Sequence, residues 1–230
     1  MRYLIVYHQR LGDIVHLFAG AKHLADQGHE VLIECNHRYH DIFRCANYVT
    51  PSSPFNRPDV DVILPLQIHE YVDGGGPRFE EYRHSGQSWG QFVYDRTPEL
   101  AGSYGPPVFT DYFEMDDQED DRPIVAPYGY SQKTPIPPEV VLDTARRLFG
   151  RSLYILTDQP HEHRMDGHLY VKRLRELPAV IRRARDFMTI NTSTSIIAAG
   201  AREAGTYWHI QEPVNNFQDD TLFGGKVLMP

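Results

Sequence analysis

Three groups of polar side chains stand where a chain of alternating strands and helices places its binding sites. Asp13, with Arg10 and His16 close by, follows a short apolar run near the N-terminus. Lys133 follows another apolar run, and the hydroxyl-rich segment 192–195 comes directly before an alanine-rich stretch. A carboxylate can accept a proton, whereas an ammonium group and hydroxyls can bind an anion. These groups therefore predict proton transfer and the binding of a phosphate.

The segment around Asp13 predicts a buried strand, a tight turn and a helix. Residues 4–6 form an apolar run typical of a strand covered on both faces. We expect Gly12 to form the turn and Asp13 to lie in the first helical turn, where the helix dipole stabilises a carboxylate. Apolar residues then recur at helical spacing: Ile14, Leu17, Phe18, Ala21, Leu24 and Ala25. We expect Gly28 to end the helix. Because ligands of open α/β sheets bind where strands end and helices begin, Asp13, Arg10 and His16 are the first candidate residues.

The rest of the chain continues this alternation. We expect strands at 30–34, 61–66, 124–127, 152–157, 168–171, 187–190 and 206–210, the last clear strand. Helices are expected at 137–149, 177–184 and 196–204, with a short one up to residue 46 that Asn36 caps. Segment 49–58 is expected to be a loop, and 79–100 to be partly helical. Strands alternating with helices, twice over, predict an α/β protein with two doubly wound halves. The acidic run 114–121 is a suitable linker, so we predict domains at 1–115 and 121–230.

The composition narrows the possible partners and compartments. The 230 residues carry a net charge of -8 without a long basic run, which argues against nucleic acid as the main partner. No apolar stretch approaches the about 20 residues of a membrane-spanning helix, and the N-terminus lacks a secretory pattern. Cys35 and Cys45 have neither metal-binding nor redox spacing, which favours reduced thiols. We therefore expect a cytoplasmic protein without a transmembrane segment.

Each candidate residue also has a purely structural interpretation. Asp13 could only cap its helix, and Lys133 could be an exposed surface lysine. The hydroxyls could likewise serve as ordinary helix caps. In the functional interpretation, hydroxyls and backbone N–H groups before a helix hold a diphosphate. The residues that would do so are Thr192, Ser193, Thr194 and Ser195, with Gly129, Tyr130 and Ser131 lining the same site.

No metal site is expected. His161, His163 and His168 match no strong zinc pattern, and no cysteine joins them. Asp59 and Asp61 form an Asp-x-Asp pair, but they precede a strand. The glycine run at 74–76 lacks the strand-to-helix context of a phosphate loop.

The motif Arg-Leu-Gly-Asp-Ile-Val-His at 10–16, with Gly-His-Glu-Val at 28–31, resembles the opening of the heptosyltransferase-like glycosyltransferases. Segments 127–139, 152–162 and 177–201 resemble the donor-side segments of that family. The resemblance implies the GT-B arrangement, in which two Rossmann-like halves face a cleft, in a compact version. It also implies a nucleotide-diphosphate sugar as donor substrate, a hydroxyl acceptor, and neither cofactor nor metal.

The resemblance assigns a role to each candidate. Asp13 matches the base that takes the acceptor proton, and Arg10, Gly12 and His16 lie on the acceptor side. On the donor side, the residues that match the diphosphate site are Lys133, Gly129 to Ser131 and the hydroxyls at 192–195. Asp158 and Glu162 match the site of the ribose or base. The expected reaction is an inverting, metal-independent sugar transfer.

One motif departs from the family pattern. The family usually has Asp, then Thr or Ser with Gly, then His, where this chain has Asn191, Thr192, Ser193 and Ile196. This altered motif favours a non-catalytic nucleotide-sugar-binding module as an alternative to the glycosyltransferase. Two further alternatives are a nucleotide-sugar epimerase, since that class shares the two-half architecture, and a glycosyltransferase acting on a hydroxymethylated DNA base, which would explain an unusual N-terminal half.

Overall fold

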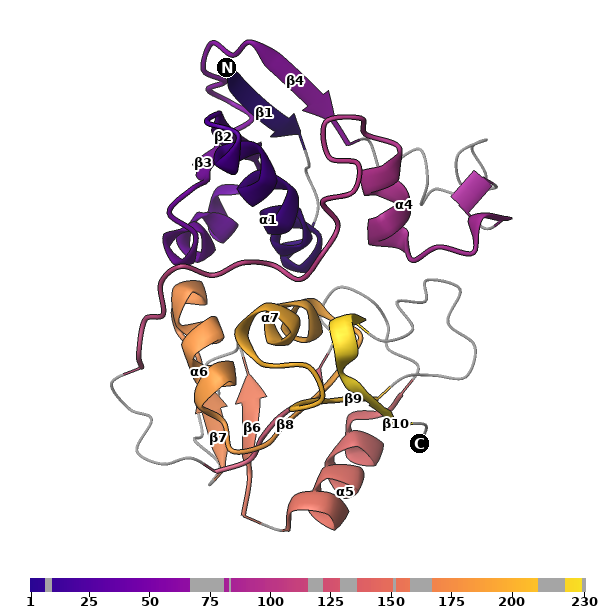
Figure 1. Cartoon of the computed structure of the whole chain (residues 1–230). Helices are drawn as coiled ribbons and strands as arrows, with labels where there is room; N and C mark the ends of the chain where they lie inside the picture. Colours follow the sequence, from indigo (N-terminus) through magenta and orange to yellow (C-terminus); the bar gives the residue numbers. More distant parts are fainter. Residues whose placement is uncertain are drawn as a thin grey trace. The chain divides into compact units, whose positions relative to one another are not determined.

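The computed structural model describes residues 1–6, 10–66, 81–82, 84–115, 122–128, 136–150, 152–157, 167–210 and 222–228. They divide between Val108 and Phe109 into two compact units, each built on its own parallel sheet (Figure 1). The α/β fold with two parallel-sheet halves is therefore confirmed. The domain ranges 1–115 and 121–230 stay a prediction. No helix in the described part of the chain is long and apolar enough to cross a membrane.

The N-terminal sheet has four parallel strands in the order β3-β2-β1-β4. Its elements are β1 (Arg2–Val6), α1 (Leu11–Asp26), β2 (Glu30–Glu34), the 3-10 helix η1 (His37–Cys45), β3 (Thr50–Ser52), β4 (Val62–Pro65) and α4 (Trp89–Asp95). The side chain of Asn36 accepts a hydrogen bond from Arg38 N–H at 3.1 Å, which confirms the predicted cap. The expectation of a plain loop at 49–58 was wrong, because β3 forms within it at the edge of the sheet.

Helix α1 buries the predicted apolar face. Ile14, Phe18 and Ala21 are fully buried, and Leu17 and Leu24 nearly so. Gly28 adopts a φ of 83° just beyond the helix, which a residue with a Cβ rarely tolerates. The N–H of Gly28 donates to Ala25 C=O at 2.9 Å. Gly28 therefore ends the helix as predicted.

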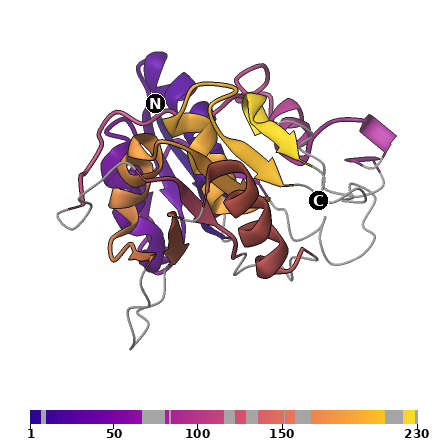
Figure 2. The same ribbon diagram turned by 90° about the horizontal axis from the view of Figure 1, so that it is seen from below.

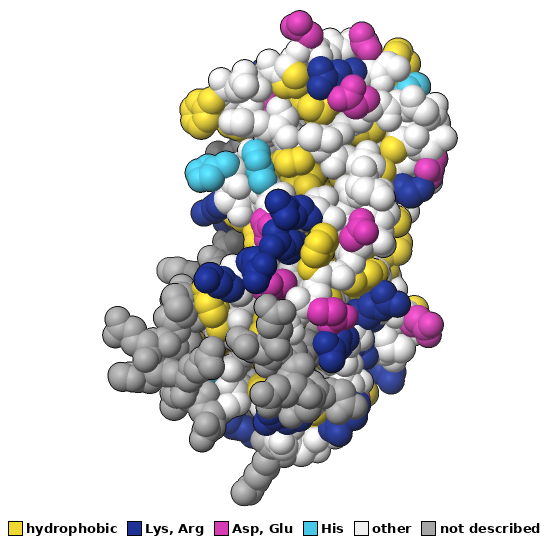
Figure 3. Space-filling view, turned by 90° about the vertical axis from the view of Figure 1, so that its left-hand side faces the viewer, with side chains coloured by type: hydrophobic (Ala, Val, Ile, Leu, Met, Phe, Trp, Pro, Cys, Tyr) yellow, Lys and Arg dark blue, Asp and Glu magenta, His cyan; other side chains and the backbone are white. Residues whose placement is uncertain are grey.

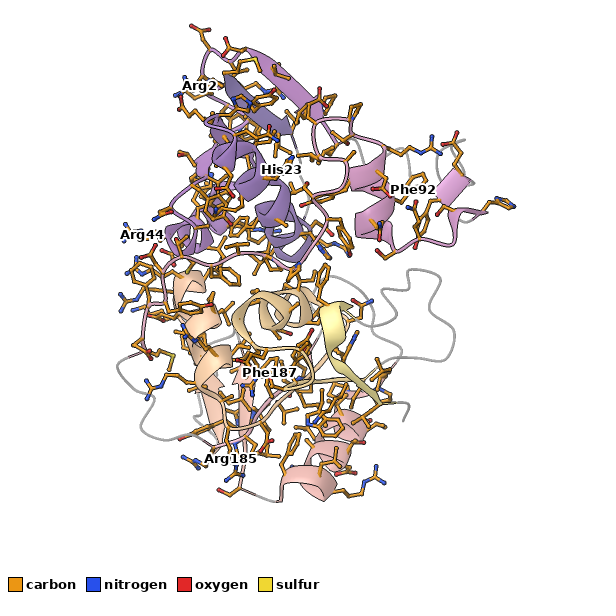
Figure 4. All side chains as sticks on the ribbon, in the orientation of Figure 1. Arg2, His23, Arg44, Phe92, Arg185 and Phe187 are labelled. Atoms are coloured by element: carbon orange, nitrogen blue, oxygen red, sulfur yellow. The ribbon has the colours of Figure 1, made fainter. Side chains whose placement is uncertain are left out.

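Helix α4 packs through aromatic side chains. Phe92, labelled in Figure 4, meets the ring of Tyr82 edge to face with centroids 5.6 Å apart. Tyr104 crosses the start of α4 so closely that a Cβ on Gly90 would lie 2.5 Å from its ring. Gly90 therefore leaves the space that Tyr104 occupies.

The C-terminal sheet has six parallel strands in the order β10-β9-β8-β5-β6-β7. The elements are β5 (Ile124–Ala126), α5 (Pro138–Phe149), β6 (Tyr154–Thr157), β7 (His168–Tyr170), η2 (Leu174–Glu176), α6 (Leu177–Arg183), β8 (Phe187–Ile190), α7 (Ser193–Ala201), β9 (Trp208–Ile210), η3 (Leu222–Gly224) and β10 (Lys226–Leu228). Strand β10 was missed, since β9 was expected to be the last strand.

Helices cover both faces of this sheet (Figure 2). Met188 and Ile190 of β8 pack in the core that Val141 and Ala145 of α5 complete. Thr189, between them, points to the other face and contacts the first turn of α7. Phe187, labelled in Figure 4, is fully buried and belongs to this same opposite side of the strand.

Arginines of α6 and its flanks bind the segment that precedes β5. Arg182 stacks over Tyr112 at 4.3 Å and Arg175 over Phe113 at 5.6 Å. Arg183 pairs with Glu114 at 2.6 Å. Both basic and acidic side chains are present on the face drawn in Figure 3. These contacts fasten residues 112–114 to α6.

Gly90→Ala should lower the free energy of unfolding by about 1–3 kcal/mol, because the added methyl group overlaps Tyr104 in a packed site. The control is Gly105→Ala, where an added Cβ meets nothing within 4 Å. Urea unfolding of both variants tests this. Equal stabilities would show that Tyr104 moves aside without cost.

Candidate functional site

Asp13 lies in the first turn of α1, as predicted, just beyond the carboxyl end of β1. The backbone N–H of Arg10, the residue that precedes the helix, donates to Asp13 Oδ2 at 3.3 Å. The carboxylate is half-buried and caps the helix start. It therefore has the capping role expected of a structural aspartate, and its position at the edge of the sheet also suits a base.

The predicted turn at Gly12 was wrong. Gly12 lies inside α1, which begins one residue earlier at Leu11, and Arg10 is the extended residue before it. Gly12 is buried in the first helical turn and does not reverse the chain. Arg10 itself is exposed.

His16 lies one turn after Asp13 and so on the same face of α1. The ring stacks on Tyr104, with centroids 6.2 Å apart and an interplanar angle of 24°. The backbone carbonyl of His16 accepts a hydrogen bond from the hydroxyl of Tyr94 at 2.5 Å. His16 is thus fixed by two tyrosines of the α4 region.

A buried carboxylate at the same edge escaped the sequence analysis. Glu34 ends β2 with no exposed surface, and Arg57 binds it through two hydrogen bonds, Nη2 to Oε1 at 3.0 Å and Nε to Oε2. The hydrogen bond and then the charge of Glu34 raise the pKa of Arg57. Ser52 lies opposite Glu34 in the β2–β3 register, and its buried Oγ has no hydrogen-bond partner among the described residues. An acidic residue about 20 positions after a strand-to-helix junction was the available signal.

The two cysteines are buried and form no disulfide, and Cys35 directly follows Glu34. Burial, and next the charge of Glu34, raise the pKa of the Cys35 thiol to about 12. The thiol is therefore protonated at neutral pH, and Cys35 is no nucleophile.

In the C-terminal half, the predicted hydroxyls lie at the junction of β8 and α7. The Ser195 hydroxyl donates to Thr192 C=O at 2.7 Å and accepts from Thr192 N–H at 3.3 Å. Thr194 Oγ1 lies 2.6 Å from Thr189 Oγ1 and 2.8 Å from Thr192 Oγ1. Three threonine hydroxyls therefore form a chain from β8 into the first turn of α7.

This geometry corrects the predicted helix start. Helix α7 begins at Ser193, three residues before the expected Ile196, so the serine and threonine residues form its first turn. The first N–H groups of a helix have no partner within it, and the helix dipole favours an anion there. Thr192 and Ser193 are half-buried at this end and remain able to contact a ligand.

The other donor-side candidates lie outside the described residues: Gly129, Tyr130, Ser131, Lys133, Asp158 and Glu162, as well as His161 and His163. The strands that lead to them are described. β5, β6 and β8 are parallel neighbours, so the chain leaves Ala126, Thr157 and Ile190 at one edge of the sheet. His168 belongs to β7. Among the residues that are described, no three His, Cys, Asp or Glu side chains are placed to hold a metal ion.

A buried histidine, which the sequence analysis missed, lies next to the threonine chain. His209 of β9 pairs with Thr189 in the parallel ladder, so both side chains point to the α7 face. The side chain is 1% exposed, and within the described part of the chain neither ring nitrogen has a hydrogen-bond partner. Burial lowers the pKa of His209 to about 4. The imidazole is therefore neutral at pH 7.

His209 should make the protein less stable in acid. Between pH 6.5 and about pH 4, the unfolded chain binds a proton at this histidine that the native chain does not bind. The free energy of unfolding should thus fall by about 3 kcal/mol as the pH drops through this window.

In His209→Leu this contribution should disappear. Urea unfolding at pH 7 and pH 4.5 gives the pH-dependent difference for each protein, so any constant cost of the substitution cancels. The same pH-dependent loss in wild type and variant would contradict the assignment.

No family model matches the sequence, and no curated protein matches it. Solved structures do match. The glycosyltransferase TibC of enterotoxigenic E. coli aligns with a TM-score of 0.65 at 12% identity, over 96% of this chain and 63% of that one. The present chain thus spans less than two thirds of the length of TibC.

Two further solved structures are similar over most of both chains. A family 9 glycosyl transferase from Veillonella parvula aligns with a TM-score of 0.63 at 12% identity, over 100% of this chain and 85% of that one. E. coli heptosyltransferase WaaC aligns with a TM-score of 0.64 at 11% identity, over 99% and 93%. The resemblance first seen in residues 10–16 is thereby confirmed at the level of the fold: this chain has the two-sheet α/β architecture of the heptosyltransferases and family 9 glycosyltransferases.

Proposed function

We propose that this protein is a glycosyltransferase that moves a sugar from a nucleotide-diphosphate sugar to a hydroxyl group, with inversion and without a metal ion. The observation that carries the proposal is Asp13, a half-buried carboxylate at the carboxyl end of β1 in a chain with this fold. Structures similar to this one contain ADP-D-beta-D-heptose in TibC and ADP or a fluorinated ADP-heptose in WaaC, which supports a nucleotide-sugar donor.

The chemistry assigns one task to each half. Asp13 accepts the proton of the acceptor hydroxyl as its oxygen attacks the anomeric carbon. The bond from that carbon to the diphosphate breaks, and its electron pair stays on the diphosphate oxygen. The N–H groups of the first turn of α7 and the ammonium group of Lys133 receive this charge. A single displacement of this kind inverts the anomeric centre.

The threonine chain suits the donor side. Because Thr194 is bonded to both Thr189 and Thr192, the first turn of α7 is held to the end of β8 before a ligand arrives. A rigid turn loses little conformational entropy when it binds a diphosphate. The hydroxyls at 192–195 thereby compensate for the departure from the family motif.

The first test is nucleotide binding. We expect titration calorimetry with ADP, UDP, GDP and CDP to show that one of these nucleotides binds equally well with and without a chelator. Lys133→Ala should weaken its affinity roughly 10- to 100-fold, since it removes a charge-assisted contact. Lys172→Ala, at an exposed lysine of the same half, is the control. The glycosyltransferase proposal fails if no nucleotide diphosphate binds, and its metal-free form fails if the chelator abolishes binding.

The second test is Asp13→Asn. The amide retains an oxygen that can accept from Arg10 N–H, but it takes up no proton at neutral pH. Turnover should fall by roughly 10²–10⁴-fold while donor affinity stays unchanged. The free energy of unfolding should drop by only about 0.3–1 kcal/mol, the value of a charge in the first helical turn.

A fully active Asp13→Asn variant would make Asp13 a helix cap and nothing more. A wild type that binds the donor but transfers or hydrolyses no sugar would instead be a binding module, and one that interconverts nucleotide sugars would be an epimerase. Transfer to hydroxymethylated DNA would identify the acceptor as nucleic acid.

A further inference from the structure

Tyr94 of α4 binds two backbone groups of α1 through its hydroxyl. The hydroxyl donates to His16 C=O at 2.5 Å and accepts from Gly20 N–H at 3.0 Å. His16 and Gly20 are four residues apart, so their carbonyl and N–H face each other along the helix. One phenol thus bridges a carbonyl and an N–H of another helix, and its side chain is 1% exposed.

Gly20 makes this approach possible. A Cβ at Gly20 would lie 3.0 Å from Tyr94 Cε1, 3.2 Å from its hydroxyl oxygen and 3.1 Å from Leu100 Cδ2. Contacts this short force the ring to move. Gly20 is therefore needed for close packing and not for its backbone angles. Gly20 and Tyr94 together form one contact between α1 and α4, the Gly20–Tyr94 contact.

A second tyrosine holds the same residue of α1 from its side chain. Tyr104 stacks on the ring of His16 and meets Tyr94 edge to face, with centroids 5.4 Å apart. The hydroxyl of Ser88, the residue that caps α4, donates to the Tyr104 hydroxyl at 3.2 Å. His16 is thus held by its carbonyl and by its ring.

The Gly20–Tyr94 contact lies close to the part of α1 that carries Asp13. Helix α1 runs as one continuous helix from Leu11 to Asp26, so a bond to the His16 carbonyl fixes the turn that comes directly after Asp13. His16 is the N-terminal member of the bonded pair and lies one turn from Asp13. Burial raises the pKa of Tyr94, which keeps the phenol protonated and therefore a donor to His16.

We propose that Tyr94 is a positioning residue, which fixes the first two turns of α1 through the His16 carbonyl and the Gly20 N–H and thereby sets the location of the Asp13 carboxylate. The inference rests on the proposed function, because it assumes that Asp13 is the base. Displacement of a base by about 1 Å costs up to about 10²-fold in rate. The expected loss therefore appears in kcat and not in donor binding.

The variant that tests this is Tyr94→Phe, which keeps the ring and removes the bridge. We expect kcat to fall roughly 10- to 100-fold with an unchanged KM for the donor, and the acidic limb of the kcat–pH profile to shift because the surroundings of Asp13 change. Tyr48→Phe is the matched control: it also loses a tyrosine-to-carbonyl bond in the same half, to Val108 at 2.6 Å, but leaves the α1 ladder intact.

Gly20→Ala tests the Gly20–Tyr94 contact by changing the residue of α1. It should lower kcat as Tyr94→Phe does, and the double variant should be no worse than the poorer single variant, because both substitutions remove one interaction. Additive losses would mean that the two residues act separately, and would overturn the proposal.

Hydrogen exchange of the α1 amides gives a readout without activity. Amides 14–19 should exchange faster in Tyr94→Phe and Gly20→Ala than in wild type, whereas amides 21–26 and the Tyr48→Phe variant should be unchanged. The proposal would be overturned if Tyr94→Phe kept the hydrogen exchange and the kcat of the wild type. It would also be overturned if Tyr48→Phe lost as much kcat as Tyr94→Phe. If exchange responds as expected but even the wild type transfers no sugar, the proposed function is wrong, while the control of the helix start by Tyr94 stands.

Discussion

Parallel strand pairing is the constraint on which the rest of this structure depends. Every strand pair that the structure describes is parallel, so each sheet collects the carboxyl ends of its strands at one edge. Helices that follow these ends present their first turns there, with unpaired N–H groups and a favourable dipole. Asp13 in one half and the hydroxyls of 192–195 in the other occupy this same type of position. The strand topology therefore determines where the two candidate sites lie, and the side chains determine what each site can bind.

The two halves satisfy buried polar groups at this edge in different ways. In the N-terminal half, the fully buried carboxylate of Glu34 is neutralised by the exposed side chain of Arg57, and removal of Arg57 would be costly because it would leave a buried charge without its partner. In the C-terminal half, neutral hydroxyls of Thr189, Thr192 and Thr194 bond to one another. Neutral groups can exchange partners at little cost when an anion arrives. The C-terminal edge is thus better suited to a charged ligand, which agrees with the proposed placement of the diphosphate.

The sequence predicted the elements with a strong pattern and missed those that depend on neighbours. The apolar spacing of α1, the stop at Gly28 and the helix that opens with Pro138 were all confirmed. β3 was missed because it contains Pro51, which a strand tolerates at the edge of a sheet. β10 was missed because it is as short as β3 and also lies at the edge of its sheet. The start of α7 was predicted three residues too late, at Ile196, because the apolar periodicity begins only there. For the site, residue type located Asp13, but the burial of Glu34 and His209 and the bridge made by Tyr94 arise from tertiary contacts without a local signature.

The strand order of the two sheets also bears on how the chain is made. The four strands of the N-terminal sheet are complete once Pro65 has left the ribosome, so this half can begin to fold during synthesis. The first four strands of the C-terminal sheet repeat this order as β7-β6-β5-β8, but two further strands follow them. β5 lies at its centre, but Ile124 must wait for Phe187 before its second edge is covered, and β9 and β10 are added after that. Long crossovers of this kind fold slowly and leave strand edges open in the meantime. The C-terminal half needs two more strands than the N-terminal half, so its strand edges stay open for longer during synthesis.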